Sequence, residues 1–515
     1  MSEKGDGGGQ RCRAASAGIE TGTGFHLSVW MEKALLLILT CGAAFLYLFR
    51  LDEATLYCDE LWRANAIMSW DVGGIRNLPP AYVAVERLFY EVLGRNAWAF
   101  RLLPALAGVG TVPAVWVLAR RSFPAGWALF SAYVVCVHPE MIGIARMGKE
   151  LSLGHLFAPL IFAALIVATE RRSVVWGVVL AGVCAAGMLF SWSVIFVAGA
   201  AVGVLFVRAI GRDGTWMDWK MCVVVGVPAL LVTMLMYGWA LGGSRLHLNI
   251  NNPHWTWPPV PWDAPVAALC WLWHSTVGLV LRCVGYGRSA WSPFFGVLLL
   301  LVASVGVSWE RREKRVLLGA ILCGVCLTVV AAFVRMWPFG GYRTMLFLIP
   351  LLAPCAGLGI RRLVVCFVDM RAYPGLFVLL VPLLFLPLLW APAVMSEEYG
   401  GYDLHALSDG LEMRSAPGAL FVIHDLPPEY VVFYLKPLPP GSRIVSLDSV
   451  ERIARQARSG QRIRVWIIGP AGMSRAEVSP GESWVVSQQI ERRGCRAILF
   501  VKDVDAGGAK NRDNR

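Results

Sequence analysis

The chain has 515 residues, of which 57% are apolar and only 16% are charged. Ordinary soluble domains carry about 25% charged residues, so the composition excludes a soluble globular enzyme, and the apolar content excludes a disordered chain. The 22 Trp and 29 Pro are typical of a membrane protein with interfacial aromatic residues and Pro-interrupted helices. Most of the 13 Cys lie in apolar runs and predict no disulfide framework, and Cys323-x-x-Cys326 lacks the second pair that a zinc site needs.

Long apolar stretches recur along the chain, and a membrane-spanning helix needs about 20 mostly apolar residues. The sequence therefore predicts a polytopic α-helical membrane protein with about eleven spans, which form a module over residues 32–395. The predicted spans are 32–50, 102–119, 124–142, 151–169, 174–190, 191–209, 219–241, 291–309, 316–334, 344–360 and 372–393. Residues 1–31 are polar and Gly-rich and are predicted to be a disordered cytoplasmic N-terminus. No cleavage site follows the first span, which we interpret as an anchor.

Arginine and lysine residues orient the predicted spans. With the N-terminus in the cytoplasm, the predicted inside loops hold 14 Lys and Arg in 38 residues, and the outside loops hold 12 in 117. This bias follows the positive-inside rule and favours a multi-pass protein of the cell (inner) membrane with its C-terminus on the extracytoplasmic side. The net charge of +12 is then a consequence of topology, and we expect no nucleic-acid partner.

The composition changes after the last predicted span. Short apolar runs alternate with polar helical stretches over residues 396–505, which predicts a small extracytoplasmic α/β domain followed by a flexible tail, 506–515. The predicted strands are Ala419–His424, Arg443–Leu447, Val465–Gly469 and Ala497–Val501. The predicted helices are Leu404–Met413, Ser449–Arg458 and about Ser483–Arg493.

The predicted outer loop between the first two spans holds two amphipathic segments. One runs from Asp59 to about Trp70, and the other begins after Pro79-Pro80. Both are expected to be helices that lie in the membrane interface. Asp59 and Glu60 open the first, either as a helix cap with a first-turn acid or as a general base at the membrane surface, whose pKa would be raised by apolar surroundings.

Cations are sparse on the predicted outer side, and three of them lie at span ends. Arg146 and Lys149 precede the fourth span, and Arg343 precedes the tenth. Such groups suit a phosphate held at membrane depth, although a single arginine can also extend to lipid headgroups.

The predicted outer loop 242–290 is rich in Trp and Asn. Trp255, Trp257, Asn252 and His254 suit the binding of a sugar or an acceptor, because Trp rings stack on sugar faces and Asn binds hydroxyls. An aromatic belt at the membrane interface explains the same residues equally well. The histidines of this loop have no spacing typical of metal ligands.

Five stretches together resemble a known family. They are LYCDEL at 56–61, LPPAY at 78–82, LGRNAWAFRLLPALAG at 93–108, the segment from His138-Pro139 through KELSL at 149–153, and FGGYR at 339–343. They resemble the GT-C type polytopic glycosyltransferases, specifically the family 39-like group of protein mannosyltransferases and aminoarabinose transferases. The resemblance covers most of residues 32–393, and its most specific part, 93–108, is interpreted as structural. Leu151 stands where an aromatic residue is usual, and Gly154 where one subgroup has an acid.

The resemblance implies an inverting glycosyltransferase that moves a sugar from a polyprenyl-phosphate donor to an acceptor hydroxyl on the extracytoplasmic face. Asp59 is then the expected catalytic base, and Glu60 would orient the acceptor or help to bind a metal. Lys149, Arg343 and, less specifically, Arg146 would bind the donor phosphate. The pattern leaves a divalent metal ion open as a cofactor, and it leaves open the sugar and whether the acceptor is a glycan, a lipid or a protein. The alternatives are a lipid or polysaccharide transporter (flippase) and a degenerate, non-catalytic membrane scaffold.

Overall fold

The computed structural model describes most of the chain. The described residues are 28–49, 51, 56, 58–121, 123–211, 214–241, 264–283, 312–333, 343–355, 419–423, 443–457, 461–470, 473, 479–480, 484–492 and 495–503. The predicted spans 291–309 and 372–393 and the predicted helix Leu404–Met413 lie outside these residues.

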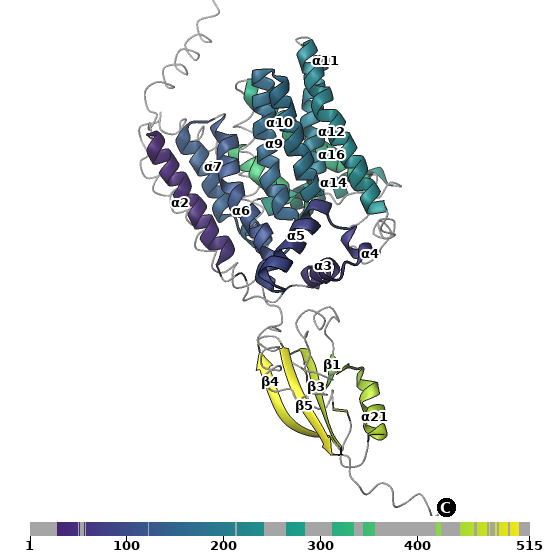
Figure 1. Ribbon diagram of the computed structural model, residues 1–515. Coiled ribbons are helices and arrows are strands. Elements are labelled where there is room, and N and C mark those ends of the chain that lie inside the picture. Colours follow the sequence, from purple (N-terminus) through teal and green to yellow (C-terminus); the bar gives the residue numbers. More distant parts are fainter. Residues whose placement is uncertain are drawn as a thin grey trace, which may run out of the picture.

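Helices form one bundle in the N-terminal two thirds of the chain (Figure 1). Their bounds are α2 (Val29–Leu48), α3 (Cys58–Ser69), α4 (Val72–Ile75), α5 (Pro80–Leu93), α6 (Ala97–Arg120), α7 (Ala125–Val137), α8 (Pro139–Ala145), α9 (Leu151–Arg171), α10 (Val174–Phe190), α11 (Val194–Ile210), α12 (Trp216–Leu241), α14 (Pro265–Cys283), α16 (Arg312–Phe333) and the 3₁₀ helix η1 (Arg343–Leu348). Helices α3, α4 and α5 lie across one end of the bundle, and we call this end the α3–α5 end.

Five of the described helices are long and apolar enough to cross a membrane. They are α2, α6, α9, α12 and the segment Val316–Phe333 of α16. Helices α10 and α11 have 17 residues each and would extend about 26 Å at 1.5 Å per residue, which is at the short limit of a span. The structure thus confirms apolar helices at most of the predicted positions, and the total of eleven stays a prediction.

The stretch predicted as a single span over 124–142 is broken. Helices α7 and α8 meet at His138-Pro139 with a bend of 58°. His138 has extended backbone angles (φ −68°, ψ 122°), because the ring of a following proline disfavours the helical conformation. Pro139 then occupies the first turn of α8, where its missing N–H costs nothing. The break changes the direction of the chain before it reaches the 146–150 segment.

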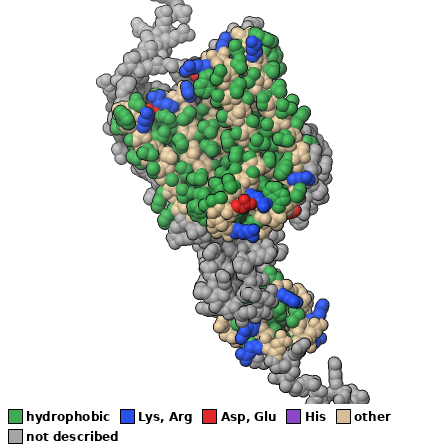
Figure 2. All heavy atoms as spheres, viewed as in Figure 1, with side chains coloured by type: hydrophobic (Ala, Val, Ile, Leu, Met, Phe, Trp, Pro, Cys, Tyr) green, Lys and Arg blue, Asp and Glu red, His purple; other side chains and the backbone are tan. Residues whose placement is uncertain are grey.

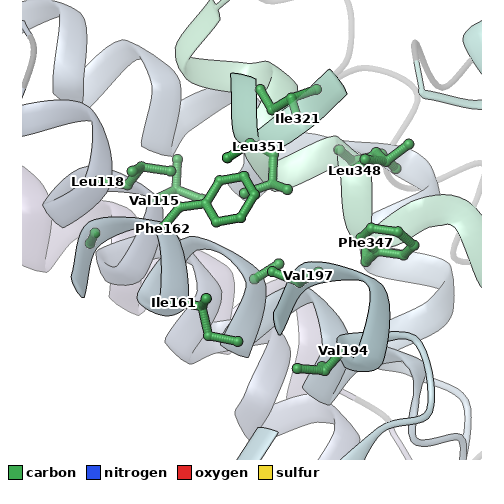
Figure 3. Packing of buried hydrophobic residues seen from close by; sticks show 14 of the residues in the cluster. Val115, Leu118, Ile161, Phe162, Val194, Val197, Ile321, Phe347, Leu348 and Leu351 are labelled. Carbon is green, nitrogen blue, oxygen red and sulfur yellow. The ribbon is translucent and has the colours of Figure 1, made fainter. Parts of the chain in front are cut away.

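The bundle core is built from apolar side chains of α6, α9, α11, α16 and the η1 region. Figure 3 shows Phe162 of α9 beside Val115 of α6 and Leu351, with Val197 of α11 on the side of Phe347. All five side chains are buried. The 3₁₀ segment that begins at Arg343 is therefore packed into the interior and does not lie on the surface.

Basic side chains gather at the end of the bundle opposite α3, α4 and α5 (Figure 2). Helices α6 and α9 finish there with Arg120 and Arg171, and α11 has Arg208 in its last turn. Glu32 of α2 pairs with Arg120 at 2.8 Å, and Asp218 of α12 pairs with Arg208 at 3.0 Å. This charge distribution agrees with the predicted orientation, in which the arginine-rich end faces the cytoplasm.

The C-terminal region forms a mixed five-stranded sheet in the order β2-β1-β3-β5-β4. The strands are β1 (Leu420–Ile423), β2 (Arg443–Ile444), β3 (Arg462–Pro470), β4 (Val485–Arg492) and β5 (Cys495–Asp503), and one helix, α21 (Leu447–Gln456), connects β2 to β3. The pairs β1–β2 and β1–β3 are parallel, and β3–β5 and β4–β5 are antiparallel. In Figure 1 the sheet lies beyond the α3–α5 end of the bundle.

The predicted helix over about Ser483–Arg493 is wrong, because residues Val485–Arg492 form strand β4. The strand lies at the edge of the sheet and pairs with β5, with a register shift between Val486 and Gln488. Ser487, Gln488 and Gln489 are exposed. Ile490 is buried and Val486 is partly buried, but the register shift between them interrupts the alternation of polar and apolar residues, so the sequence of the strand resembles a surface helix.

Candidate active site

Two indole hydrogen bonds attach the α4–α5 connection to the bundle. Trp192, in the turn between α10 and α11, donates its Nε1–H to the carbonyl of Asn77 at 3.1 Å. Trp239 of α12 donates to the carbonyl of Leu78, also at 3.1 Å. These contacts occupy the two carbonyls that precede Pro79-Pro80 and fix where α5 begins. The second amphipathic segment of the predicted outer loop is therefore packed on the bundle along one face.

A buried ion pair joins the start of α3 to α6. The Glu60 carboxylate accepts from Arg101 Nε at 3.2 Å and from Arg101 Nη2 at 3.0 Å, and both side chains are about 1% exposed. Glu60 also accepts from the backbone N–H of Gly148, and Arg101 Nη1 donates to the carbonyl of Leu51 at 3.1 Å. The carboxylate thus connects α3, α6 and the 146–150 turn. Its described contacts are structural, and its predicted role toward an acceptor or a metal stays a prediction.

The turn at residues 146–150 is enclosed by α3 and α6. Arg63 of α3 forms an ion pair with Glu150 at the end of the turn. A Cβ atom at Gly148 would lie 2.0 Å from the Phe100 ring, so only glycine fits there. The acidic start of α3 and the basic 146–150 turn, which are about 90 positions apart in the sequence, are therefore held together as one site.

The predicted phosphate-binding cations Arg146 and Lys149 lie in this turn and are buried, at 5% and 6% exposure. Arg146 Nη1 donates to the carbonyls of Leu46 at 3.2 Å and Phe49 at 2.7 Å, at the C-terminal end of α2. A cation at the carbonyl end of a helix is favoured by the helix dipole. Arg146 thus has an evident structural role, which leaves Lys149 as the stronger candidate in this turn for a phosphate.

The remaining predicted site residues are described only in part. Asp59 lies in the first turn of α3, directly before Glu60, but its side chain is outside the described residues. Arg343 begins η1, which packs against α9, and its side chain is likewise outside them. Trp255, Trp257, Asn252 and His254 fall wholly outside. Within the part of the chain that the structure describes, no three His, Cys, Asp or Glu side chains form a metal site.

The segment 93–108 is structural in every described contact. Gly94 ends α5 with φ +88°, a conformation that favours glycine. Asn96 caps α6 by accepting from the backbone N–H of Ala99 at 2.7 Å. A Cβ atom at Gly108 would lie 2.6 Å from that of Ala145. Because this segment also supplies Arg101, its sequence specifies how α5, α6 and α8 meet beside the site.

Two polar side chains of α5 were missed by the sequence interpretation. Glu86 and Tyr82 are fully buried one helical turn apart, and apart from each other neither the Glu86 carboxyl oxygens nor the Tyr82 hydroxyl has a hydrogen-bond partner among the described residues. Burial raises the pKa of Glu86 well above its ordinary value, and the nearby Tyr82 hydroxyl offsets part of this. The signal in the sequence was an acid four residues after Tyr82 and four residues before Tyr90, which is the spacing of one helix face.

Residue 154 departs from the pattern of one subgroup for a steric reason. A Cβ atom at Gly154 would lie 2.5 Å from Ser193 Oγ and 3.0 Å from Ser191 Oγ, in the turn between α10 and α11. An acidic side chain does not fit in this packing. Both serines are buried and their hydroxyls are 3.1 Å apart.

Comparisons with known proteins support the same architecture. Residues 77–239 match the family model for dolichyl-phosphate-mannose-protein mannosyltransferase. The fold is similar to ArnT from Cupriavidus metallidurans bound to undecaprenyl phosphate, with 15% identity, a TM-score of 0.53, and coverage of 92% of this chain and 98% of that one. The resemblance to GT-C glycosyltransferases is confirmed.

A second solved structure has a similar fold. The apo oligosaccharyltransferase of Archaeoglobus fulgidus aligns over 86% of this chain and 70% of its own, with 11% identity and a TM-score of 0.51. No curated protein matches the sequence. At these identities the similarity shows the fold, and the roles of single residues must be argued from the site.

Proposed function

We propose that the chain is an integral membrane glycosyltransferase that moves a sugar from a polyprenyl-phosphate donor to an acceptor hydroxyl on the extracytoplasmic face. The observation that carries this proposal is the alignment with ArnT over 98% of that protein, which is bound to undecaprenyl phosphate. The joining of α3 to the 146–150 turn supports it, because it brings the backbone of the proposed base beside the proposed phosphate ligands.

In the proposed reaction Asp59 accepts the proton of the acceptor hydroxyl as its oxygen attacks the anomeric carbon. The bond between that carbon and the phosphate oxygen breaks, and polyprenyl phosphate leaves with the bonding electrons. A single displacement inverts the anomeric centre and needs no second carboxylate as nucleophile. Lys149 and Arg343 stabilise the charge that develops on the leaving phosphate. Arg146 contributes through the position of the turn, and Trp255, Trp257, Asn252 and His254 stay proposed contacts for sugar or acceptor.

The decisive experiment uses the purified full-length chain in detergent. Binding of undecaprenyl phosphate is measured first, and then turnover of undecaprenyl-phosphate sugars by mass spectrometry of the released lipid phosphate. We expect saturable binding that weakens when Lys149 is replaced by Met. Glu91→Gln is the control, because Glu91 is exposed on α5 and pairs only with Arg87 in the described structure. Absence of lipid-phosphate binding would reject the proposal.

The location of the site is tested separately with topology reporters. A reporter fused after Val394 is expected on the extracytoplasmic side, and one inserted at Glu313 in the cytoplasm. Both reporters on the same side would contradict the three spans predicted between Glu313 and Val394.

A further inference from the structure

The polar face of α5 lies against the 146–150 turn. At one end of this face, the Tyr82 phenol is close enough to Arg63 and Glu150 for their charges to act on it. At the other end, Tyr90 stacks on Phe100 with ring centroids 5.8 Å apart, and the Phe100 ring covers Gly148. Glu86 lies midway between these two points on the same helix face, and so it faces the turn that carries Lys149.

The opposite face of α5 is exposed and mixed in character. Leu88 and Val92 are 53% and 70% exposed, and Glu91, which is 62% exposed, pairs with Arg87 beside them. Glu86 therefore points away from this exposed face and into the protein. A buried carboxyl whose only described partner is the Tyr82 hydroxyl is costly in a folded protein, and such groups in native structures call for an explanation.

We propose that Glu86 and Tyr82 form a subsite for hydroxyl groups of the donor sugar, next to the phosphate-binding turn. This inference rests on the proposed function. A neutral carboxyl group donates one hydrogen bond and accepts others, and a phenol does both. The pair therefore suits the hydroxyls of a sugar. It suits an anion less well, because an ionised carboxyl would repel it, and it offers too few ligands for a metal ion.

The pair is closed to solvent in the structure, so the sugar reaches it only if α5 moves away from the turn. The N-terminal end of α5 is held by Trp192 and Trp239, and its C-terminal end is held by the Asn96 amide, which donates to the carbonyl of Leu93 at 3.2 Å. Displacement of the helix and the turn from one another opens the face that carries Glu86 toward Lys149. The sugar hydroxyls then take the hydrogen-bonding positions that the described residues leave empty.

The test compares lipids with and without a sugar. Affinity for bare undecaprenyl phosphate and for undecaprenyl phosphate that carries mannose, glucose or aminoarabinose is measured on the full chain. For wild type, we expect at least one sugar-bearing lipid to bind more tightly than the bare lipid. Glu86→Leu should reduce this sugar-dependent gain by about three- to tenfold and leave the affinity for bare undecaprenyl phosphate unchanged. Tyr82→Phe should reduce it less, and Glu91→Leu, the matched change on the exposed face, should not affect it.

A pH series separates a binding role from a packing role. Because burial raises the pKa of Glu86, the sugar-dependent gain should fall as pH rises and the carboxyl ionises. Glu86→Gln should keep the gain, since an amide also donates and accepts, but should lose its pH dependence.

The subsite is overturned if no sugar-bearing lipid binds more tightly than the bare lipid, if the wild-type gain does not fall with pH, or if Glu86→Leu keeps the gain and merely raises the unfolding temperature. Each of these results with undecaprenyl phosphate still bound rejects the subsite alone. Loss of lipid-phosphate binding by wild type rejects the proposed function as well.

Discussion

At the arginine-rich end of the bundle, the described ion pairs are placed where helices begin and end. Arg120 is 44% exposed and pairs with Glu32, and Arg208 pairs with Asp218 ten positions along the chain. At the α3–α5 end, by contrast, Glu60 and Arg101 are about 1% exposed and Glu150 is 9% exposed. At the arginine-rich end each arginine keeps some exposure, 44% for Arg120 and 15% for Arg208, although Glu32 and Asp218 are buried. At the α3–α5 end both partners of the Glu60–Arg101 pair are fully buried, where charge is most costly and where a chemical function gives a reason for it.

Two neighbouring acids in the first turn of α3 have different roles. Glu60 is engaged by three donors from two other segments, while Asp59 precedes it on α3 and has the proposed catalytic role.

The largest effect is expected for Asp59→Asn. Loss of a general base should lower transfer by about 10²–10⁴-fold, while the amount of folded protein and the binding of undecaprenyl phosphate stay unchanged. The measurement is initial-rate turnover of the donor that wild type uses. Asp71→Asn is the control, because Asp71 lies in the same outer loop and caps α4, a task that Asn also performs. Near-full activity of Asp59→Asn would remove this residue from the mechanism.

Breaking the buried ion pair should act on stability. Arg101→Met leaves Glu60 buried without its partner and should cost about 3–5 kcal/mol in the free energy of unfolding, measured by thermal unfolding in detergent. The double variant Arg101→Met with Glu60→Leu should recover much of this loss, since no charge then remains buried. At the other end, Arg120→Met should cost less, because Arg120 is partly exposed and the buried Glu32 keeps its hydrogen bond from Trp116 Nε1 at 3.1 Å. Equal losses at both ends would contradict the contrast drawn here.

Most elements that depend on local sequence were predicted correctly, whereas features that depend on contacts between distant segments were missed. Apolar runs set the spans, so α6, α9 and α12 were predicted from local sequence, and Pro139 broke one predicted span by a local steric effect. Strand β4 was missed because its pairing with β5 at the sheet edge overrides a helix-like sequence. The Glu60–Arg101 pair and the face with Tyr82 and Glu86 were missed because they depend on which helix faces meet, and periodicity does not specify that.

A moderate effect is expected at the proposed phosphate ligand Arg343. Arg343→Lys keeps the charge but loses the forked geometry that binds phosphate through two hydrogen bonds. One lost charge-assisted hydrogen bond is worth about 1.5–3 kcal/mol, so the affinity for undecaprenyl phosphate should fall by at least about tenfold. Lys149→Arg keeps a donor and is expected to change this affinity less. If Arg343→Lys binds the lipid as wild type does, Arg343 does not contact the phosphate.

The smallest effect concerns the attachment of α5. Trp239→Phe keeps an aromatic ring against Leu78 but removes the indole donor to its carbonyl, which lies 3.1 Å away. A neutral hydrogen bond contributes about 1 kcal/mol, so we expect a small decrease in unfolding temperature. Hydrogen exchange should increase over Asn77 to Leu93 and stay unchanged in α9, because the indole bond fixes the start of α5 and not the bundle. Trp219→Phe is the control, since Trp219 lies at the arginine-rich end of α12, packed against Phe206. Two results would show that the α3–α5 end does not depend on this attachment. One is that exchange increases only in the Trp219→Phe control, and the other is that Trp239→Phe increases exchange evenly over the whole bundle.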